Sequence, residues 1–102
     1  MKLKELKTID IVALGYRDTV NGNSYFSSNV ILNHGLNNSI QLKIPFQYGY
    51  ELQYLTTSLE EVSKHFKRSK WFKRYMNKDM IEKKYNIKIT HKITRGCKKR
   101  EL

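Results

Sequence analysis

The chain has 102 residues and a mass of 12.2 kDa, which suffices for one compact domain but not for two independent cores. No apolar stretch approaches the roughly 20 residues that span a bilayer, and the charged residues 1–7 precede no apolar signal segment, so we expect no transmembrane helix and no secretion. A single cysteine, Cys97, excludes an internal disulfide and a multi-thiolate zinc site, while the net charge of +11 favours a polyanionic partner. These features predict a small basic protein of the reducing cytoplasm.

Alternating hydrophobicity predicts three strands in the first half of the chain, at residues 9–16, 25–32 and 40–46. The Asn21-Gly22 pair favours a tight hairpin between the first two strands, because both residue types tolerate positive φ angles. Alternation in the third strand places Ile44 and Phe46 together in the core. Pro45 cannot donate a ladder hydrogen bond and indicates a sheet edge or a bulge.

A helix is expected to cover this sheet after an irregular aromatic connection at residues 47–55. Ser58 and Glu61 match a capping box, so the helix is predicted to begin there and to continue to about residue 76. Its apolar positions share one helical stripe, made of Leu59, Val62, Phe66, Phe72 and Met76. A bend, or a second helix after a break, is the alternative for the end of this segment.

The rest of the chain completes an α+β fold. Asn77 is expected to start a short helix that extends to about residue 84, and residues 87–94 alternate as a last strand. The predicted order is therefore a three-stranded antiparallel meander, a covering helix, a short helix and a final strand. We expect a single domain over residues 1–96 and a flexible basic tail over residues 97–102.

Nearly all of the positive charge lies in the second half of the chain. Residues 1–63 contain five basic and six acidic side chains, whereas residues 64–102 contain fifteen basic and three acidic side chains, a net charge of +12. Each phosphate neutralised by Lys or Arg releases condensed counterions, so this asymmetry favours nucleic acid as the partner. Two other interpretations stay open: another acidic surface, or a basic face that serves solubility alone.

A run of basic and aromatic side chains at residues 64–75 is the leading candidate for the binding site. Lys and Arg there supply phosphate contacts, and Trp71 and Tyr75 lie outside the apolar stripe, where rings can stack on bases. The alternative is that both rings pack against the sheet or the aromatic connection and leave a solvated basic face. Residues that alternate outward on the last strand, and the tail, extend the patch. The predicted nucleic-acid-binding residues are Lys64, Lys67, Arg68, Lys70, Trp71, Lys73, Arg74, Tyr75, Lys88, Lys92, Lys98, Lys99 and Arg100.

The residue types needed for catalysis do not converge in the sequence, so the chain is predicted not to be an enzyme. His34, His65, His91 and Cys97 are scattered without paired spacing, and we expect no metal and no cofactor. The sequence contains neither a Gly-rich phosphate loop nor a nucleophile elbow. His91 falls on an isoleucine-lined strand face and is interpreted as a hydrogen-bonded structural histidine.

Polar side chains on the predicted sheet form a second candidate surface, made of Tyr25, Ser27, Asn29, Gln41 and Lys43. The layout resembles AP2-type domains and certain integrase arm-binding domains, in which a three-stranded sheet backed by a helix enters the DNA major groove. Those domains generally carry several Arg and Trp on the reading face, whereas here only Arg17 and Lys43 are basic. The alternative is a sheet face that is merely solvated.

Two segments of the first half, NGNSYFS at residues 21–27 and IPFQYGY at residues 44–50, resemble small, mostly uncharacterised proteins encoded by bacteriophages and prophages. The resemblance implies a phage origin, three initial strands and an aromatic crossing, but no established activity and no site residues. The basic second half lies outside it. A phage origin raises another class of function, in which a small protein binds and blocks a host or defence protein.

The sequence thus supports two hypotheses. In the first, the chain binds DNA or RNA through phosphate contacts with low sequence specificity, and its affinity depends steeply on salt. In the alternative, it is a phage accessory or inhibitor protein whose exposed tyrosines, with Tyr48, Tyr50 and Tyr54 as candidates, anchor a host protein.

Overall fold

A computed structural model describes residues 2–66 and 77–102 of the chain. The elements in these ranges are β1 (Thr8–Asp18), β2 (Asn23–Leu32), β3 (Ile40–Tyr48), α1 (Gln53–His65), α2 (Lys78–Tyr85) and β4 (Lys88–Thr94), with short 3-10 turns η1 (Leu3–Glu5) and η3 (Lys99–Glu101). The α+β class and the predicted order of elements are confirmed. Of the helices in these ranges, none is long and apolar enough to cross a membrane.

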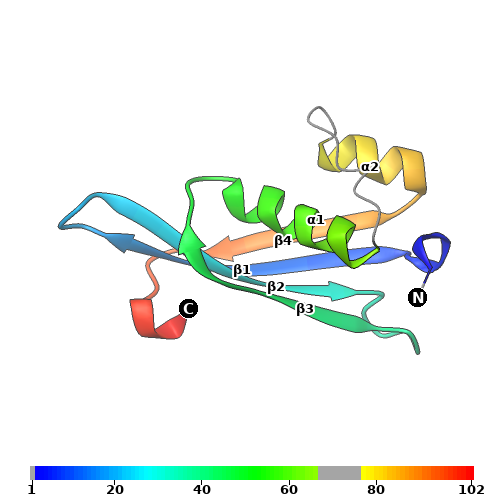
Figure 1. Ribbon diagram of the computed structural model, residues 1–102, viewed down its shortest axis with the longest axis horizontal. Helices are drawn as coiled ribbons and strands as arrows, with labels where there is room; N and C mark the ends of the chain where they lie inside the picture. Colours follow the sequence, from blue (N-terminus) through cyan, green and yellow to red (C-terminus); the bar gives the residue numbers. More distant parts are fainter. Residues whose placement is uncertain (1, 67–76) are drawn as a thin grey trace.

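The four strands form one mixed sheet in the order β3-β2-β1-β4. Strands β1, β2 and β3 are an antiparallel meander, whereas β4 pairs with the other edge of β1 in parallel orientation. A parallel pairing of this kind needs a crossover connection, and the segment that contains α1 and α2 provides it. Both helices lie on one face of the sheet, and η3 lies on the opposite side (Figure 1).

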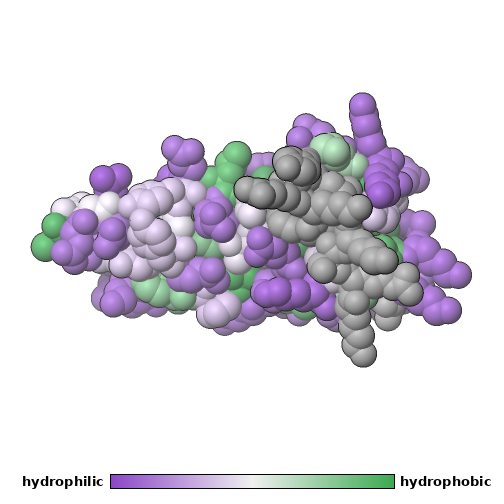
Figure 2. All heavy atoms as spheres, turned by 45° about the horizontal axis from the view of Figure 1, so that its top comes forward, coloured by the Kyte–Doolittle hydropathy of each residue, from purple (hydrophilic) through white to green (hydrophobic). Residues whose placement is uncertain are grey.

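The core fills the space between the sheet and the helices. Every second residue of β1 points toward the helices, and side chains from the other elements meet them; buried members include Ile9, Ile11, Ala13, Phe26, Val30, Leu32, Leu59, Val62, Ile81 and Ile89. Complete burial of one such aliphatic side chain contributes about 1.5–3 kcal/mol. The outer surface on the helix side is mostly hydrophilic, with small hydrophobic areas (Figure 2), so the apolar faces of the helices are turned toward the sheet.

Helix α1 begins five residues before the predicted capping box. Its N-cap is Leu52, which makes no side-chain capping hydrogen bond. Ser58 is instead buried in the helix interior, and its hydroxyl oxygen lies 2.8 Å from that of Ser28 on β2. The capping-box prediction is wrong because the buried stripe already starts at Tyr54 and continues through Ser58 to Val62, at a helical spacing of four residues. The predicted extension of the helix through residues 67–76 lies outside the described residues.

A register shift between β2 and β3 moves Phe46 to the face opposite the core. One extra residue of β3 is accommodated between the pairs Phe26–Gln47 and Ser28–Ile44. The ring of Phe46 therefore stacks on Tyr25, with the centroids 4.9 Å apart, and the prediction that it fills the core is wrong. Pro45 lies at this irregularity on edge strand β3, as expected for a residue without an N–H group.

Helix α2 and strand β4 are joined by one carboxylate. The predicted start of α2 is confirmed, since the side chain of Asn77 accepts a hydrogen bond from the amide of Met80 at 2.9 Å. Glu82 of α2 accepts a hydrogen bond from the amide of Ile89 on β4 at 2.9 Å, and its other oxygen accepts one from Lys78 at 3.0 Å. This contact sets the position of α2 relative to the edge of the sheet.

Candidate nucleic-acid interface

The structure separates the predicted nucleic-acid-binding residues into groups. Those in the basic and aromatic run lie outside the described residues; they are Lys67, Arg68, Lys70, Trp71, Lys73, Arg74 and Tyr75. Lys64 is at the end of α1, on the helix-covered side of the sheet, 3.3 Å from Glu61. The remaining members lie on β4 and in the C-terminal segment and are all exposed; they are Lys88, Lys92, Lys98, Lys99 and Arg100.

The sheet face that points away from the helices, called the open face below, collects many of the polar side chains. Strand register assigns to it Asp10, Val12, Leu14, Tyr16, Tyr25, Ser27, Asn29, Ile31, Gln41, Lys43, Phe46, Tyr48, Lys88, Thr90, Lys92 and Thr94. All members of the polar surface predicted from the sequence share this face. Lys92 is directly opposite Val12, so the outward orientation predicted for it on the last strand is confirmed.

Aromatic rings gather at one end of the open face. Tyr25 is at the centre: its ring centroid lies 6.1 Å from that of Tyr16, 4.9 Å from that of Phe46 and 5.9 Å from that of Tyr48. We call these four residues the aromatic cluster. Tyr50 continues the row: its ring is edge-on to that of Tyr48, with the ring centroids 5.1 Å apart. Tyr48 is 53% exposed and the other three residues of the cluster are half-buried, so the rings pack against one another and still leave ring surface accessible to solvent.

Basic side chains border the aromatic cluster. The amide of Cys97 donates a hydrogen bond to the carbonyl of Gly15 at 3.0 Å, which fixes the start of the C-terminal segment against β1. The segment then forms η3 on the open side of the sheet (Figure 1), where the ammonium group of Lys99 lies 5.8 Å from the centroid of the Phe46 ring. Lys98 and Arg100 flank it and are exposed. The predicted basic tail therefore contributes positive charge beside the rings.

Acidic groups on the open side of the sheet are engaged in local hydrogen bonds. The side chain and amide of Asn21 both donate to Asp18, and these hydrogen bonds lower the pKa of that carboxyl group. Asp10 accepts a hydrogen bond from the hydroxyl of Thr90. Glu101 accepts one from the amide of Lys98 at 2.9 Å. None of Lys88, Lys92, Lys98, Lys99 and Arg100 forms an ion pair within 4.0 Å with a carboxylate of residues 2–66 and 77–102.

A partly buried hydrogen-bonded pair on the helix side accounts for two residues singled out in the sequence. The Tyr54 hydroxyl lies 2.8 Å from Nδ1 of His91, which confirms His91 as a hydrogen-bonded histidine. Tyr54 is 4% exposed, and this burial raises its pKa, so it is unavailable as a surface anchor. Within residues 2–66 and 77–102, no group of three or more His, Cys, Asp and Glu side chains is placed to hold a metal ion.

The aromatic cluster as a unit is the part of this surface that sequence reasoning missed. The pairing of Tyr16 with Tyr25 has a signal in the sequence. The hairpin pairs Asp18 with Asn23, so counting back from the turn brings Tyr16 opposite Tyr25. The position of Phe46 has no such signal, because this residue reaches the cluster only through the register shift between β2 and β3.

Comparisons of the chain with protein-family models, with curated proteins and with solved structures give no match. The resemblance of residues 21–27 and 44–50 to phage-encoded proteins stays a prediction. The geometry of the open face is therefore the basis for a functional proposal.

Proposed function

We propose that the protein binds single-stranded nucleic acid across the open face of its sheet. The observation that carries this proposal is the aromatic cluster, with Lys99 against one ring and further exposed cations beside it. Every base presents a flat π surface, and stacking of one base on an aromatic side chain contributes roughly 1–3 kcal/mol. In a duplex both faces of each base are already stacked, so this surface favours an unpaired strand.

The proposed binding mode has low sequence specificity. Lysine is a point charge that attracts phosphate oxygens, and a ring accepts any base, so neither type of contact reads base edges. The basic run at residues 64–75 stays in the proposal as a source of additional phosphate contacts. We place this activity in the cytoplasm, which is the host cytoplasm if the chain is phage-encoded.

The direct test is fluorescence anisotropy with labelled single-stranded DNA, single-stranded RNA and duplex DNA over a series of salt concentrations. We expect both single strands to bind more tightly than the duplex, with log affinity falling linearly as log salt rises. Equal affinity for the duplex would contradict stacking of bases on the aromatic cluster. A protein that binds no nucleic acid even at low salt would contradict the proposal as a whole.

A matched pair of charge variants locates the binding surface. The K92Q/R100Q protein loses two cations from the open side, whereas K83Q/K84Q loses two exposed cations from α2 on the helix side. We expect the first to reduce the slope of log affinity against log salt by about 1.4, because each phosphate contact with a single strand contributes about 0.7. The control is expected to keep the wild-type slope; equal loss in both proteins would indicate attraction by net charge alone.

Blocking of a host or defence protein is the second candidate. It is favoured by one observation: Tyr48, Tyr50 and Leu52 are 53%, 46% and 57% exposed and follow one another along the connection into α1. In a pull-down from host lysate, Y48A/Y50A is then expected to lose a partner that wild-type protein retains at moderate salt. Retention of the same partner by Y48A/Y50A would exclude these tyrosines as its anchors.

A further inference from the structure

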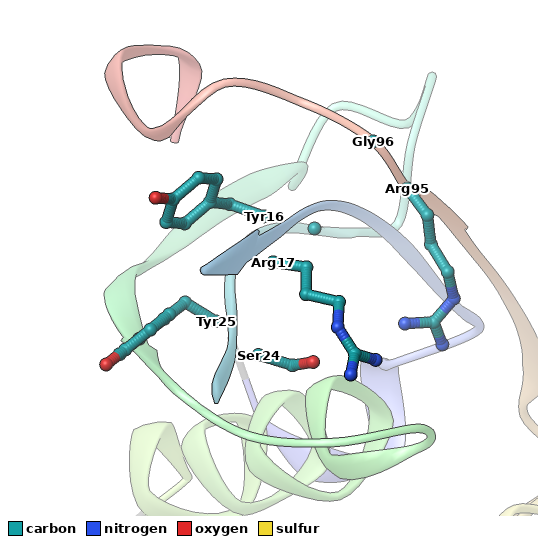
Figure 3. A pocket seen from close by; sticks show the side chains of 7 residues that line it. Tyr16, Arg17, Ser24, Tyr25, Arg95 and Gly96 are labelled. Carbon is teal, nitrogen blue, oxygen red and sulfur yellow. The ribbon is translucent and has the colours of Figure 1, made fainter. Parts of the chain in front are cut away.

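A pocket lies where β1 and β2 extend beyond the end of β4. Its volume is about 310 Å³, and it is lined by Gly15, Tyr16, Arg17, Ser24, Tyr25, Arg95 and Gly96. In Figure 3 the side chains of Arg17, Ser24 and Arg95 point to one side of the strands, whereas Tyr16 and Tyr25 point away from them. The pocket is thus formed on the helix side of the same strand ends that carry the aromatic cluster on the open side.

At the floor of the pocket, Gly15 of β1 lets the side chains of Ile93 and Arg95 lie close to the strand. Gly15 follows Ile11 and Ala13 on the helix side of β1, but contributes no side chain to that face. A Cβ atom at this position would lie 3.3 Å from Cδ1 of Ile93 on the neighbouring strand. Arg17 and Ser24 are directly opposite each other in the β1–β2 pairing, so they border this floor as a cross-strand pair.

The pocket brings two arginines together without a described acidic partner. Neither guanidinium lies within 4.0 Å of a carboxylate oxygen among residues 2–66 and 77–102. Arg95 donates a hydrogen bond to the carbonyl of Glu51 at 3.2 Å, which orients its guanidinium and leaves its other N–H groups available. Both arginines are exposed, so a dissolved ligand can reach them.

We infer that this pocket is a binding site for a terminal phosphate or diphosphate group. A guanidinium group donates in parallel to two oxygens, and a carboxylate has only two, which one arginine already satisfies. A terminal phosphate has three free oxygens and close to two negative charges, which match two arginines and the Ser24 hydroxyl. The pocket volume is at the lower end of the range of about 300–1,000 Å³ for small-molecule sites, which leaves room for part of the group that carries the phosphate.

The test is a titration of the ¹⁵N-labelled full chain with sodium pyrophosphate at constant ionic strength, followed by amide chemical shifts. We expect saturable shifts at Gly15, Ser24 and Gly96. The R17Q/R95Q protein is expected to bind about tenfold or more weakly, since it loses both charge-assisted forks. K83Q/K84Q removes the same charge elsewhere and is expected to bind as the wild type does.

A second variant distinguishes a loss of binding from a loss of folding. R17K/R95K keeps the charge but loses the planar forks, so we expect severalfold weaker binding with an unchanged amide spectrum in the free state. Absence of saturable shifts in the wild-type protein, or equal weakening in K83Q/K84Q, would overturn the inference. K92Q/R100Q removes two cations of the open side and is expected to leave pyrophosphate binding intact, so failure of this inference and failure of the proposed function give different results.

Two sources of the phosphate are separated by a matched pair of oligonucleotides. If the ligand is the end of a nucleic-acid strand, a 5′-phosphorylated oligonucleotide shifts the amides of Gly15, Ser24 and Gly96 further than its 5′-hydroxyl counterpart does, and R17Q/R95Q removes this difference. If the ligand is a phosphorylated small molecule, pyrophosphate shifts these amides and the two oligonucleotides give the same shifts as each other.

Discussion

The side chain of Asn33 holds the start of β1 against the loop that follows β2. It is completely buried, with φ at +52°, where Asn is among the better-tolerated residues. Its Oδ1 atom accepts hydrogen bonds from the amides of Lys7 at 2.6 Å and Thr8 at 3.2 Å. Its Nδ2 atom donates to the carbonyl of Glu5 at 2.9 Å and to Oδ1 of Asn38 at 3.0 Å. Both donors and the acceptor of this amide are therefore used in the interior.

The Asn33→Asp substitution replaces the two donors with an acceptor and introduces a charge. We expect it to lower the free energy of unfolding by roughly 2–4 kcal/mol, since each buried polar group left unpaired costs about 1–3 kcal/mol. Urea denaturation measures the effect. Asn37→Asp, at an exposed position of the same loop, is the control and is expected to change stability by less than about 0.5 kcal/mol. Similar losses in both variants would contradict the role assigned to Asn33.

Gly49 is required by close packing at the end of β3. A Cβ atom there would lie 2.6 Å from Cε1 of Phe26 and 2.7 Å from Cγ of Gln53. Gln53 can move, but the ring of Phe26 is held in the core. We expect Gly49→Ala to cost about 1–3 kcal/mol through overpacking, which lowers the melting temperature by several degrees. An unchanged melting temperature would show that the ring of Phe26 moves aside freely.

Among the elements, the contact between α2 and β4 through Glu82 is expected to stabilise the fold in a pH-dependent way. The amide of Ile89 and the ammonium group of Lys78 lower the pKa of Glu82 from its usual value of 4.5. A carboxyl group whose pKa is lower in the folded state stabilises the fold above its unfolded pKa, and this contribution disappears as pH falls through the folded pKa. This contact is therefore expected to weaken below about pH 4.5.

The Glu82→Gln substitution is expected to lower the free energy of unfolding by roughly 1 kcal/mol at pH 7. This difference from the wild type is expected to shrink as the pH falls and the Glu82 carboxylate of the wild-type protein becomes protonated. Thermal unfolding at several pH values measures both effects. Asp79→Asn is the matched control on the same helix, because Asp79 lies 3.7 Å from Lys78 and its side chain is 83% exposed. A loss at Glu82 that does not depend on pH would contradict this explanation.

The elements that could be predicted from the sequence are those with a strong local pattern. All three strands of the meander were expected within a few residues of their bounds, because their alternation is local. The start of α1 could not be predicted, because Leu52 gives no capping signal and the buried stripe includes the polar Ser58. The parallel pairing of β4 with β1 depends on a contact between distant segments, which no short pattern records.

The candidate site was predictable to a similar extent. The outward orientation of Lys88 and Lys92 follows from strand alternation and is confirmed. The face on which Phe46 lies depends on an extra residue in β3, and the position of Lys99 beside it depends on how the C-terminal segment packs. Both are tertiary contacts, so the aromatic cluster emerges only from the folded arrangement.

At the scale of the whole molecule, the sheet separates two kinds of surface. One face carries the helices and the core, and the other carries the aromatic cluster, with η3 on the same side (Figure 1). The C-terminal segment connects these surfaces, since Arg95 borders the pocket on the helix side and Lys99 lies against Phe46 on the open side. We therefore assign stacking of an unpaired strand to the open face, and we assign the core and, beyond the end of β4, the phosphate pocket to the helix side.

The most direct measurement is amide chemical-shift mapping of the ¹⁵N-labelled chain with a short oligothymidylate. We expect the largest shifts at Tyr25, Phe46, Lys92 and Lys99, all on the open side of the sheet, while the amides of α1 change little. Shifts confined to α1 and α2, with the open face unchanged, would contradict strand binding on the open face.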